Sequence, residues 1–441
     1  MKFEYKKLEA KSFWSRRVYD IRKEGFVGLV YVYNYVKAWF NFLPGIIAVI
    51  PIILIIRIIR PFIFIRFGNL NSGRIGHWAF DTEMYLTEKE LGLHPQGAVD
   101  LFHLGRTPCN EQFNIMCERK LLMSYSWIVK DQVHSFYRYL WMCNEIIPFG
   151  SKHTIVMNTS LGSRDLTGSL AKTKPHLSFN KVESERGNNF LSEIGLNKGD
   201  KYVCILVRDS KYLSETLSGD TTHHDYRNSG IEIYKESALY LAEKGYFVIR
   251  MGKMVHEPFT VNHPRILDYS KSPYHSDFLD IWLMAHCHFC LTTGTGLDDI
   301  CVAFRRPLVE VNYLPAGLIR SNQAHALSIF KHLKWKKNGK LLSLNELVNT
   351  NALYFLHSSS YEELGIEIVD NTSEEILDSV IEMEKRLNGT WKDEQEDLKL
   401  QNIFWEKFKN GSLYKERFAW VNPDSKISAA FLQKNQSWFL N

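Results

Sequence analysis

The sequence predicts an α/β protein made of two parallel-sheet units in series. Short apolar runs alternate with helical patterns along the chain, and Gly-rich turns follow several of these runs. The length of 441 residues is enough for two or three domains. The seven cysteines are scattered, and no CxxC pairs with a second one, which indicates neither a zinc site nor a disulfide framework.

A basic and apolar segment precedes the first unit. Residues 1–41 are basic and aromatic, and the run Phe42–Ile56 carries no charge. The run starts too late for a signal peptide, is short for a bilayer span, and is interrupted by Pro44 and Pro51. We expect residues 42–60 to dip into one leaflet as a monotopic or re-entrant anchor, with basic flanks on anionic head groups. An ordinary buried helix and a single tilted span remain alternatives.

The first unit is expected to open with a strand, a Gly/Asn-rich loop and a helix. The expected elements in order are the strand Phe62–Ile65, the loop Arg66–Gly76, the helix His77–Leu86, the strand Val99–Leu104, the helix Glu111–Leu122 and a helical stretch Trp127–Phe149.

The second unit repeats the alternation of strand and helix that gives a parallel sheet. Its expected strands are Tyr202–Val207, Tyr246–Arg250, Arg265–Asp268, His288–Thr292 and Pro307–Val311. Its expected helices are Ile233–Lys244, Phe278–Ala285, Asp298–Phe304, Glu374–Asn388, Glu394–Phe408 and Ser425–Phe439.

We therefore expect a membrane-associated segment at residues 1–60, a first domain at 61–188 and a second at 189–441. The linker is placed near Arg186–Asn189, after an irregular polar stretch. Two such units in series would face a cleft, and open parallel sheets bind ligands beyond the carboxyl ends of their strands.

The turn after the fourth strand of the second unit is the best candidate for holding a nucleotide's phosphates. A strand that enters a Gly/Thr turn and then a helix start offers main-chain N–H groups and small hydroxyls to an anion. The residues assigned to the donor here are Thr293, Gly294, Thr295, Gly296 and Asp298. Asp298 either caps the following helix or receives sugar hydroxyls, and an ordinary strand–helix turn is the alternative.

Basic side chains follow two other strands of this unit. Arg208 comes directly after a buried strand and suits a diphosphate, because guanidinium forms bidentate bonds to phosphate oxygens. Arg250 and Lys253 repeat the arrangement after the next strand, and both are assigned to the donor. The alternatives are an Arg–Asp pair that organises a loop, and a solvated loop charge.

A dense polar cluster contains His224, Asp225, Arg227 and Asn228. Adjacent histidines with one Asp are a poor metal-ligand spacing, so no metal is assigned. We expect acceptor or sugar contacts from these four residues, with a structured loop as the alternative.

A candidate general base lies at the start of the first unit's first helix. His77 and Asp81 are four residues apart, which puts both on one helix face. Asp81 would orient His77 and raise its basicity. A capping or packing histidine is the alternative.

Taken together, these motifs resemble those of the bacterial glycosyltransferases encoded in surface-polysaccharide (O-antigen and capsule) gene clusters. The resemblance is carried by Ser72–His77, Val207–Ser210, Asp225–Asn228, Val248–Gly252, Ser276–Asp280 and Thr293–Leu297. It implies a GT-B arrangement of two Rossmann-like domains with the nucleotide-sugar held mainly by the second, and no bound metal. It also adds Arg74, in the first motif, to the acceptor contacts, and places Arg208 like the phosphate-binding arginine of GT-B fucosyltransferases. His77 falls where many inverting GT-B enzymes keep their base. No DxD motif is present.

The expected function is transfer of a sugar from a nucleotide-sugar to a polyprenyl-linked saccharide at the cytoplasmic face of the inner membrane. In a direct displacement, His77 would take the acceptor proton, while Arg208, Lys253 and the Thr293–Gly296 backbone stabilise the departing diphosphate. No cofactor beyond the nucleotide-sugar co-substrate and no nucleic-acid partner are expected. Two alternatives stay open: transfer of another group such as pyruvyl, and a non-catalytic membrane scaffold that binds nucleotide or saccharide.

Overall fold

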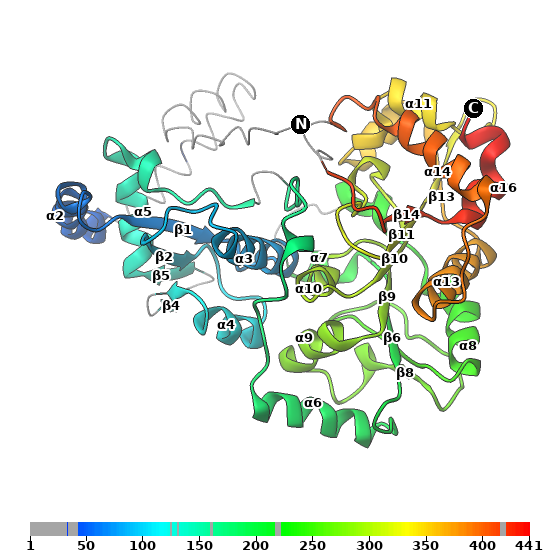
Figure 1. Ribbon diagram of the computed structural model, residues 1–441, viewed down its shortest axis with the longest axis horizontal. Helices are drawn as coiled ribbons and strands as arrows, with labels where there is room; N and C mark the ends of the chain where they lie inside the picture. The colour runs from blue at the N-terminus through cyan, green and yellow to red at the C-terminus, as the bar shows by residue number, and fades with distance from the viewer. Residues whose placement is uncertain are drawn as a thin grey trace. The chain divides into compact units, whose positions relative to one another are not determined.

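The computed structural model divides into two compact units, Met1–Ser163 and Arg164–Asn441 (Figure 1). The residues that it describes are 33, 43–123, 126–129, 132–158, 162–216, 222–414 and 420–441. Nearly all of the basic stretch 1–41 thus lies outside the described residues. The expectation of an α/β fold with parallel sheets is confirmed in both units.

The first unit is built on a small parallel sheet in the order β1-β2-β3, in which Phe67 of β1 lies opposite Leu101 of β2. Its elements are α2 (Leu43–Ile59), β1 (Ile65–Leu70), α3 (Ile75–Glu90), β2 (Val99–Leu104), α4 (Glu111–Glu118), β3 (Leu122–Met123), β4 (Ser126–Val129), β5 (Gln132–Ser135), α5 (Phe136–Ile146) and the 3-10 turn η1 (Gly150–His153). Strands β4 and β5 form a separate antiparallel hairpin.

Two expectations for this unit were wrong. The first strand is Ile65–Leu70, so the expected loop begins inside it. Arg66 is buried in that strand because its guanidinium makes two 2.7 Å bonds to the carboxylate of Asp100 on β2, which neutralises the charge. The helix expected at Trp127–Phe149 is the β4–β5 hairpin followed by α5, which begins where the Ser135 side chain accepts from Arg138 N.

Helix α2 is apolar on two opposite sides. One side packs on α5, in a cluster that also contains Phe67 of β1, and is formed by Ile46, Val49, Ile53 and Ile56. The other side is exposed and carries Ile47, Ile50, Leu54, Ile55 and Ile58. Among the described residues, no helix has the length and apolar character that crossing a bilayer requires. The buried-helix alternative therefore describes only one half of this element.

The second unit contains a seven-stranded, wholly parallel sheet in the order β14-β11-β10-β9-β6-β7-β8. The strands are β6 (Tyr202–Leu206), β7 (Phe247–Arg250), β8 (Ile266–Asp268), β9 (Phe289–Thr292), β10 (Leu308–Tyr313), β11 (Ala326–Phe330) and β14 (Lys426–Ile427), with the antiparallel pair β12 (His332–Trp335) and β13 (Ile366–Val369) outside it. The helices are α6 (Lys181–Glu193), α7 (Lys211–Thr216), α8 (Lys235–Glu243), α9 (Asp277–His286), α10 (Asp299–Ala303), α11 (Leu344–Asn349), α12 (Ser358–Glu363), α13 (Ser373–Leu387), α14 (Gln395–Phe408) and α16 (Ala429–Phe439).

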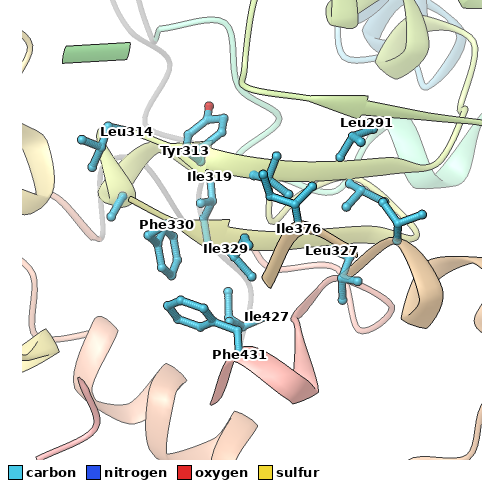
Figure 2. Packing of buried hydrophobic residues seen from close by; sticks show 14 of the residues in the cluster. Leu291, Tyr313, Leu314, Ile319, Leu327, Ile329, Phe330, Ile376, Ile427 and Phe431 are labelled. Atoms are coloured by element: carbon cyan, nitrogen blue, oxygen red, sulfur yellow. The ribbon is translucent and has the colours of Figure 1, made fainter. Parts of the chain in front are cut away.

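Helices cover both faces of this sheet. In Figure 1, α8 and α13 lie on one side and α9 and α10 on the other, and α6 packs against α9. The core on the α13 face is shown in Figure 2, where Ile376 of α13 and Phe431 of α16 lie against the strands. The ring of Phe431 meets that of Phe330 on β11 at 6.2 Å between centroids.

The linker expected at Arg186–Asn189 is in fact the middle of α6. This helix begins at the capping residue Asn180, which shares a capping box with Glu183. Gly187 then lies so close to α9 that a Cβ built on it would be 2.0 Å from Cε2 of Trp282. The tight contact with α9 makes α6 part of the second unit, whose boundary is Arg164.

Candidate functional site

The order of the seven-stranded sheet reverses between β6 and β9. From β6 the chain moves outward to β7 and β8, and then returns to β9 on the other side of β6. Arg208 follows β6 and Thr293 follows β9, and the two loops are joined by hydrogen bonds. Arg208 N donates to Thr293 Oγ1 at 2.9 Å, and Thr293 N donates to Leu206 O at 3.3 Å. Open α/β sheets bind ligands outside the carboxyl ends of strands at this kind of reversal.

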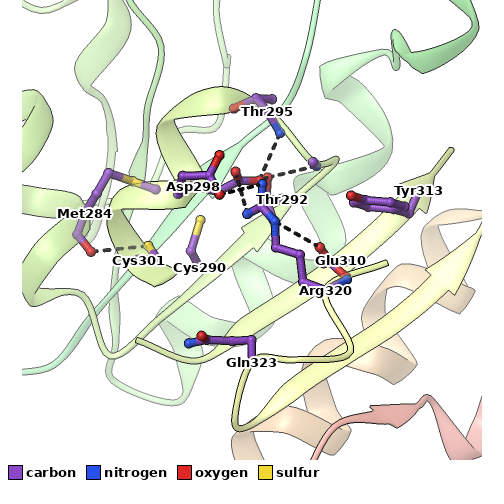
Figure 3. A network of polar contacts seen from close by, with 12 residues as sticks. Met284, Cys290, Thr292, Thr295, Asp298, Cys301, Glu310, Tyr313, Arg320 and Gln323 are labelled. Carbon is purple, nitrogen blue, oxygen red and sulfur yellow. Dashed lines mark hydrogen bonds and ion pairs between the residues drawn. The ribbon is translucent and has the colours of Figure 1, made fainter. Parts of the chain in front are cut away.

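The Gly/Thr turn at this point is closed by its own hydrogen bonds (Figure 3). Gly294 N donates to Thr292 Oγ1 at 3.1 Å, and Thr295 N donates to Asp298 Oδ2 at 2.9 Å. Since Thr293 N is also used, the main-chain N–H groups at three of the predicted donor positions already have acceptors. The prediction that they hold the diphosphate is not supported, because an anion would have to displace bonds that form the turn.

Asp298 is fully buried and does not face a sugar. Its Oδ1 lies 2.7 Å from Arg320 Nη1, and Arg320 also reaches Asp299 Oδ1 at 3.2 Å and Glu310 Oε1 at 3.9 Å (Figure 3). Three carboxyl groups thus share one guanidinium, and burial raises the pKa of Glu310. The buried group of Asp298, Asp299, Glu310 and Arg320 below the turn therefore carries no excess of positive charge. Asp298 has a structural role.

Positive charge at the turn comes instead from the side chain of Arg227. Arg227, at the end of the 3-10 turn η4 (Thr222–Arg227), donates from Nη2 to Gly294 O, and its buried Nε has no acceptor. Within the part of the chain that the structure describes, Arg227 has no carboxylate partner. Burial raises the pKa of Tyr226, and the positive charges of Arg227 and Arg208 partly counteract this rise.

Gly294 allows this arrangement because its φ is +75° and a Cβ there would lie 2.4 Å from Cε2 of Tyr313. The turn can therefore pack on the Tyr313 ring while its carbonyl accepts from Arg227. Two residues predicted for different roles meet at this turn: Arg208, assigned to the donor, through its main chain, and Arg227, assigned to the acceptor, through its side chain.

The other basic residues assigned to the donor are paired within the unit. Arg250 is 2% exposed, with Nη1 3.2 Å from Asp268 Oδ1 and bonded to Ser270 Oγ, so the assignment to the donor is wrong. Its side chain is turned into the core by that ion pair. Lys253 is half-buried and lies 2.9 Å from Asp277 Oδ1. Burial lowers the pKa of Lys253, but the contact with Asp277 outweighs this and raises it.

The polar cluster around Arg227 mostly forms its own turn. Asn228 Nδ2 donates to Asp225 Oδ1 at 2.8 Å, and Asn228 N donates to Asp225 O at 2.9 Å. The His224 ring packs on His223 with 4.0 Å between centroids. These contacts favour the structured-loop alternative for Asp225 and Asn228.

In the first unit, the candidate base is linked to its carboxylate through a third residue. His77 Nδ1 lies 2.7 Å from Ser163 Oγ, and Ser163 Oγ donates to Asp81 Oδ1 at 3.2 Å. Because the hydroxyl gives its proton to Asp81, its oxygen accepts from the imidazole N–H, which leaves Nε2 as the basic nitrogen. Asp81 is 1% exposed and His77 is partly exposed.

Ser163 could not be found from the sequence, because it lies far along the chain from α3 in a polar stretch without a motif. Its φ is +54°, and its hydroxyl contacts His77 and Asp81 of α3. Arg74 caps the start of α3 through its main chain and its side chain is exposed, one turn before His77.

No group of three or more His, Cys, Asp or Glu residues that could hold a metal ion occurs among the described residues. Cys287 and Cys290 are buried in the core, and Cys287 Sγ lies 3.8 Å from Cys301 Sγ. Cys287 caps the C-terminal end of α9 and Cys290 lies in β9, and the thiols of Cys287 and Cys301 both donate to Met284 O.

No model of a known protein family matches the chain, and no curated protein matches it. Solved structures that are similar include a glycosyltransferase family 9 protein of Veillonella parvula, with 12% identity, a TM-score of 0.38, and coverage of 61% of this chain and 86% of that chain. Another is the E. coli ADP-heptose LPS heptosyltransferase II, with 13% identity, a TM-score of 0.35 and coverage of 60% and 90%. E. coli heptosyltransferase WaaC with ADP has 13% identity, a TM-score of 0.26 and coverage of 56% and 87%. At these identities and TM-scores, the activity of this chain has to be argued from its own residues.

Proposed function

We propose that the chain is a glycosyltransferase that moves a sugar from a nucleotide-sugar to a lipid-linked saccharide, without a bound metal. The acceptor would be polyprenyl-linked and presented at the cytoplasmic face of the inner membrane. The observation that carries the proposal is the turn at the strand-order reversal of a seven-stranded parallel sheet, where the Arg227 guanidinium is bonded to Gly294 O and the main chain of Arg208 to Thr293.

The donor site is proposed at this reversal because a leaving nucleoside diphosphate needs positive charge that is fixed before the reaction. Planar guanidinium groups bind phosphate oxygens through charge-assisted, often bidentate bonds. Arg227 contributes one N–H to a main-chain carbonyl and retains further donors, and Arg208 is tied to the same turn through its own main chain. In the transition state, these two side chains would stabilise the charge that develops on the diphosphate.

The base is proposed to be His77, supported by Ser163 and Asp81. Nε2 of His77 would take the proton of the acceptor hydroxyl as its oxygen attacks the anomeric carbon and the bond to the diphosphate breaks. The resulting imidazolium is stabilised through Ser163 by the buried Asp81 carboxylate.

Membrane attachment is proposed through the exposed side of α2. The exposed isoleucines and leucine of this helix form a continuous apolar stripe beside the arginines near its C-terminus. A stripe of this kind suits a helix that lies in the interface rather than one that spans the bilayer.

The test is a thermal-shift panel of UDP-, GDP-, CMP-, dTDP- and ADP-linked sugars, followed by a transfer assay with the best binder. At a free ligand concentration of about 100 times Kd, binding adds about 2.7 kcal/mol to stability, which raises Tm measurably. We expect one nucleotide class to bind and to be turned over, with turnover lost in His77→Ala while binding is kept. Binding without any transfer or hydrolysis would contradict the proposed activity and favour a scaffold.

A further inference from the structure

Two arginines stand one turn apart at the C-terminal end of α2. Arg57 lies in the last turn of the helix and Arg60 follows its end. Together with Pro61 and Phe64 they line an open hollow on the surface of the first unit. The guanidinium of Arg60 lies over the Phe64 ring, 5.2 Å from its centroid.

The hollow carries positive charge that the described residues do not neutralise. Arg57 Nη2 donates to Asn144 Oδ1 at 2.5 Å and Nε to Pro148 O at 3.4 Å, while the buried Nη1 has no acceptor. Neither Arg57 nor Arg60 has a carboxylate partner within the described part of the chain. Burial, and then the charge of Arg60, lower the pKa of Arg57, as expected where two cations lack a counter-ion.

His153, whose ring centroid lies 5.3 Å from that of Phe64, adds no charge of either sign at neutral pH. Burial and the charge of Arg57 lower the pKa of His153 to about 4, so its imidazole is neutral there. The positive potential of the hollow therefore comes from the two arginines.

An apolar rim surrounds this charge. Ile58 is 74% exposed, Phe62 89% and Ile63 48%, and all three are neighbours of the two arginines along the chain. Large apolar side chains at such exposure would lie in hydrocarbon once α2 is on a membrane. The hollow would then lie at the depth of the lipid phosphates, where basic side chains are attracted to anionic groups.

We propose that Arg57 and Arg60 form a binding site for the phosphate of a membrane lipid. Such a phosphate group occurs both in the head group of a bilayer phospholipid and in a polyprenyl-linked acceptor. The inference rests on the membrane attachment in the proposed function and adds a specific anion site to it. Arg57 would contact the phosphate from the buried side and Arg60 from the exposed side.

The experiment is co-flotation of the full chain with vesicles. Three compositions are used: phosphatidylcholine alone, the same lipid doped with phosphatidylglycerol, and the same lipid doped with polyprenyl monophosphate at equal added charge. Arg60→Gln is compared with Lys120→Gln, which removes one exposed charge after α4 in the same unit. The double variant Arg57→Gln/Arg60→Gln is included, with its Tm measured to verify that it folds.

We expect both doped vesicles to bind the wild-type chain more tightly than phosphatidylcholine does. Arg60→Gln should lose about fivefold in affinity, since a basic residue at an anionic surface contributes about 1 kcal/mol, and Lys120→Gln should lose little. Tighter binding to polyprenyl phosphate than to phosphatidylglycerol would identify the acceptor lipid as the source of the phosphate, and equal binding would identify the bilayer head groups.

Equal losses in Arg60→Gln and Lys120→Gln would overturn the site, as would wild-type binding that is the same on neutral and doped vesicles. The second outcome leaves membrane attachment through the apolar rim intact. Failure to bind any vesicle would overturn both the site and the proposed attachment. Sugar transfer is measured separately, with a water-soluble acceptor. The vesicle results therefore test the lipid site and the membrane attachment, and the transfer assay tests the proposed activity.

Discussion

Replacing Arg227 by Gln is the sharpest test of the donor site. The side chain is half-buried, is bonded to Gly294 O and has no carboxylate partner among the described residues. If its remaining N–H groups bind a phosphate, their loss removes charge-assisted hydrogen bonds worth about 1.5–3 kcal/mol. At 1.4 kcal/mol for each tenfold change, the dissociation constant of a nucleoside diphosphate should rise by about 10- to 150-fold.

A matched control is available in the same unit. Arg265 is also half-buried and also donates to a glycine carbonyl, Gly245 O, at 2.9 Å, but it lies just before β8, at the amino end of the strands. Arg265→Gln therefore removes the same charge and the same kind of bond from the opposite edge of the sheet. It should cost about 1 kcal/mol of stability or less and leave nucleotide affinity unchanged.

The measurement is calorimetric titration of each variant with the nucleoside diphosphate that gives the largest thermal shift, and with inorganic pyrophosphate. We expect the loss in Arg227→Gln to appear with both ligands, because the contact is to phosphate. If Arg227→Gln binds as tightly as Arg265→Gln, the guanidinium does not face the ligand and the donor site has been placed wrongly.

Three further predictions address the base, the packing of the second unit and its pH dependence. Ser163→Gly removes the hydroxyl that contacts His77, and glycine accepts the φ of +54° without strain. The kcat should fall on the order of tenfold while the KM for the donor stays unchanged. A raised KM at constant kcat would contradict a positioning role for Ser163. Gly187→Ala should lower the free energy of unfolding by about 1–3 kcal/mol in a denaturant titration, because the new Cβ would overlap the indole ring of Trp282. The control Asn189→Ala, on the exposed side of α6, should change the free energy of unfolding by less than about 0.5 kcal/mol. Burial raises the pKa of Asp280 from 3.8 to about 6. Protonation of this carboxyl therefore stabilises the folded state at low pH, and this stabilisation is lost as the pH rises from about 4 to about 6. Asp280→Asn should flatten this part of the stability profile by at most about 3 kcal/mol, and an unchanged profile would show that the carboxyl titrates normally.

The strands of the second unit were predictable because each is an apolar run bounded by turn residues. The expected Tyr202–Val207, for example, is Tyr202–Leu206 in the structure. The first strand of the other unit was missed because its arginine looks like a loop residue until the partner carboxylate on β2 is known. Strand β14 is two residues long and is defined only by its pairing with β11, which no local pattern encodes.

The candidate site was predictable in position but not in detail. Residues that follow β6 and β9 had to lie at the same edge if the sheet was parallel, and the observed strand order brings Arg208 and Thr293 together there. The spacing of Thr295 and Asp298 is that of a capping box, which already indicated that this carboxylate would be used by the turn itself. The contact of Arg227 with Gly294 depends on how a long connection folds back, and sequence periodicity carries no information about it.

The two-sided character of α2 has a mechanical consequence. Its buried side packs on α5, α5 packs on β1, and β1 leads through residues 71–74 into the helix that carries His77. Lipid contact and proton transfer would therefore share one scaffold without a flexible tether between them. The distance of the His77 imidazole from the bilayer surface would then be constant. Only acceptor hydroxyl groups at that distance from the surface would come within its reach.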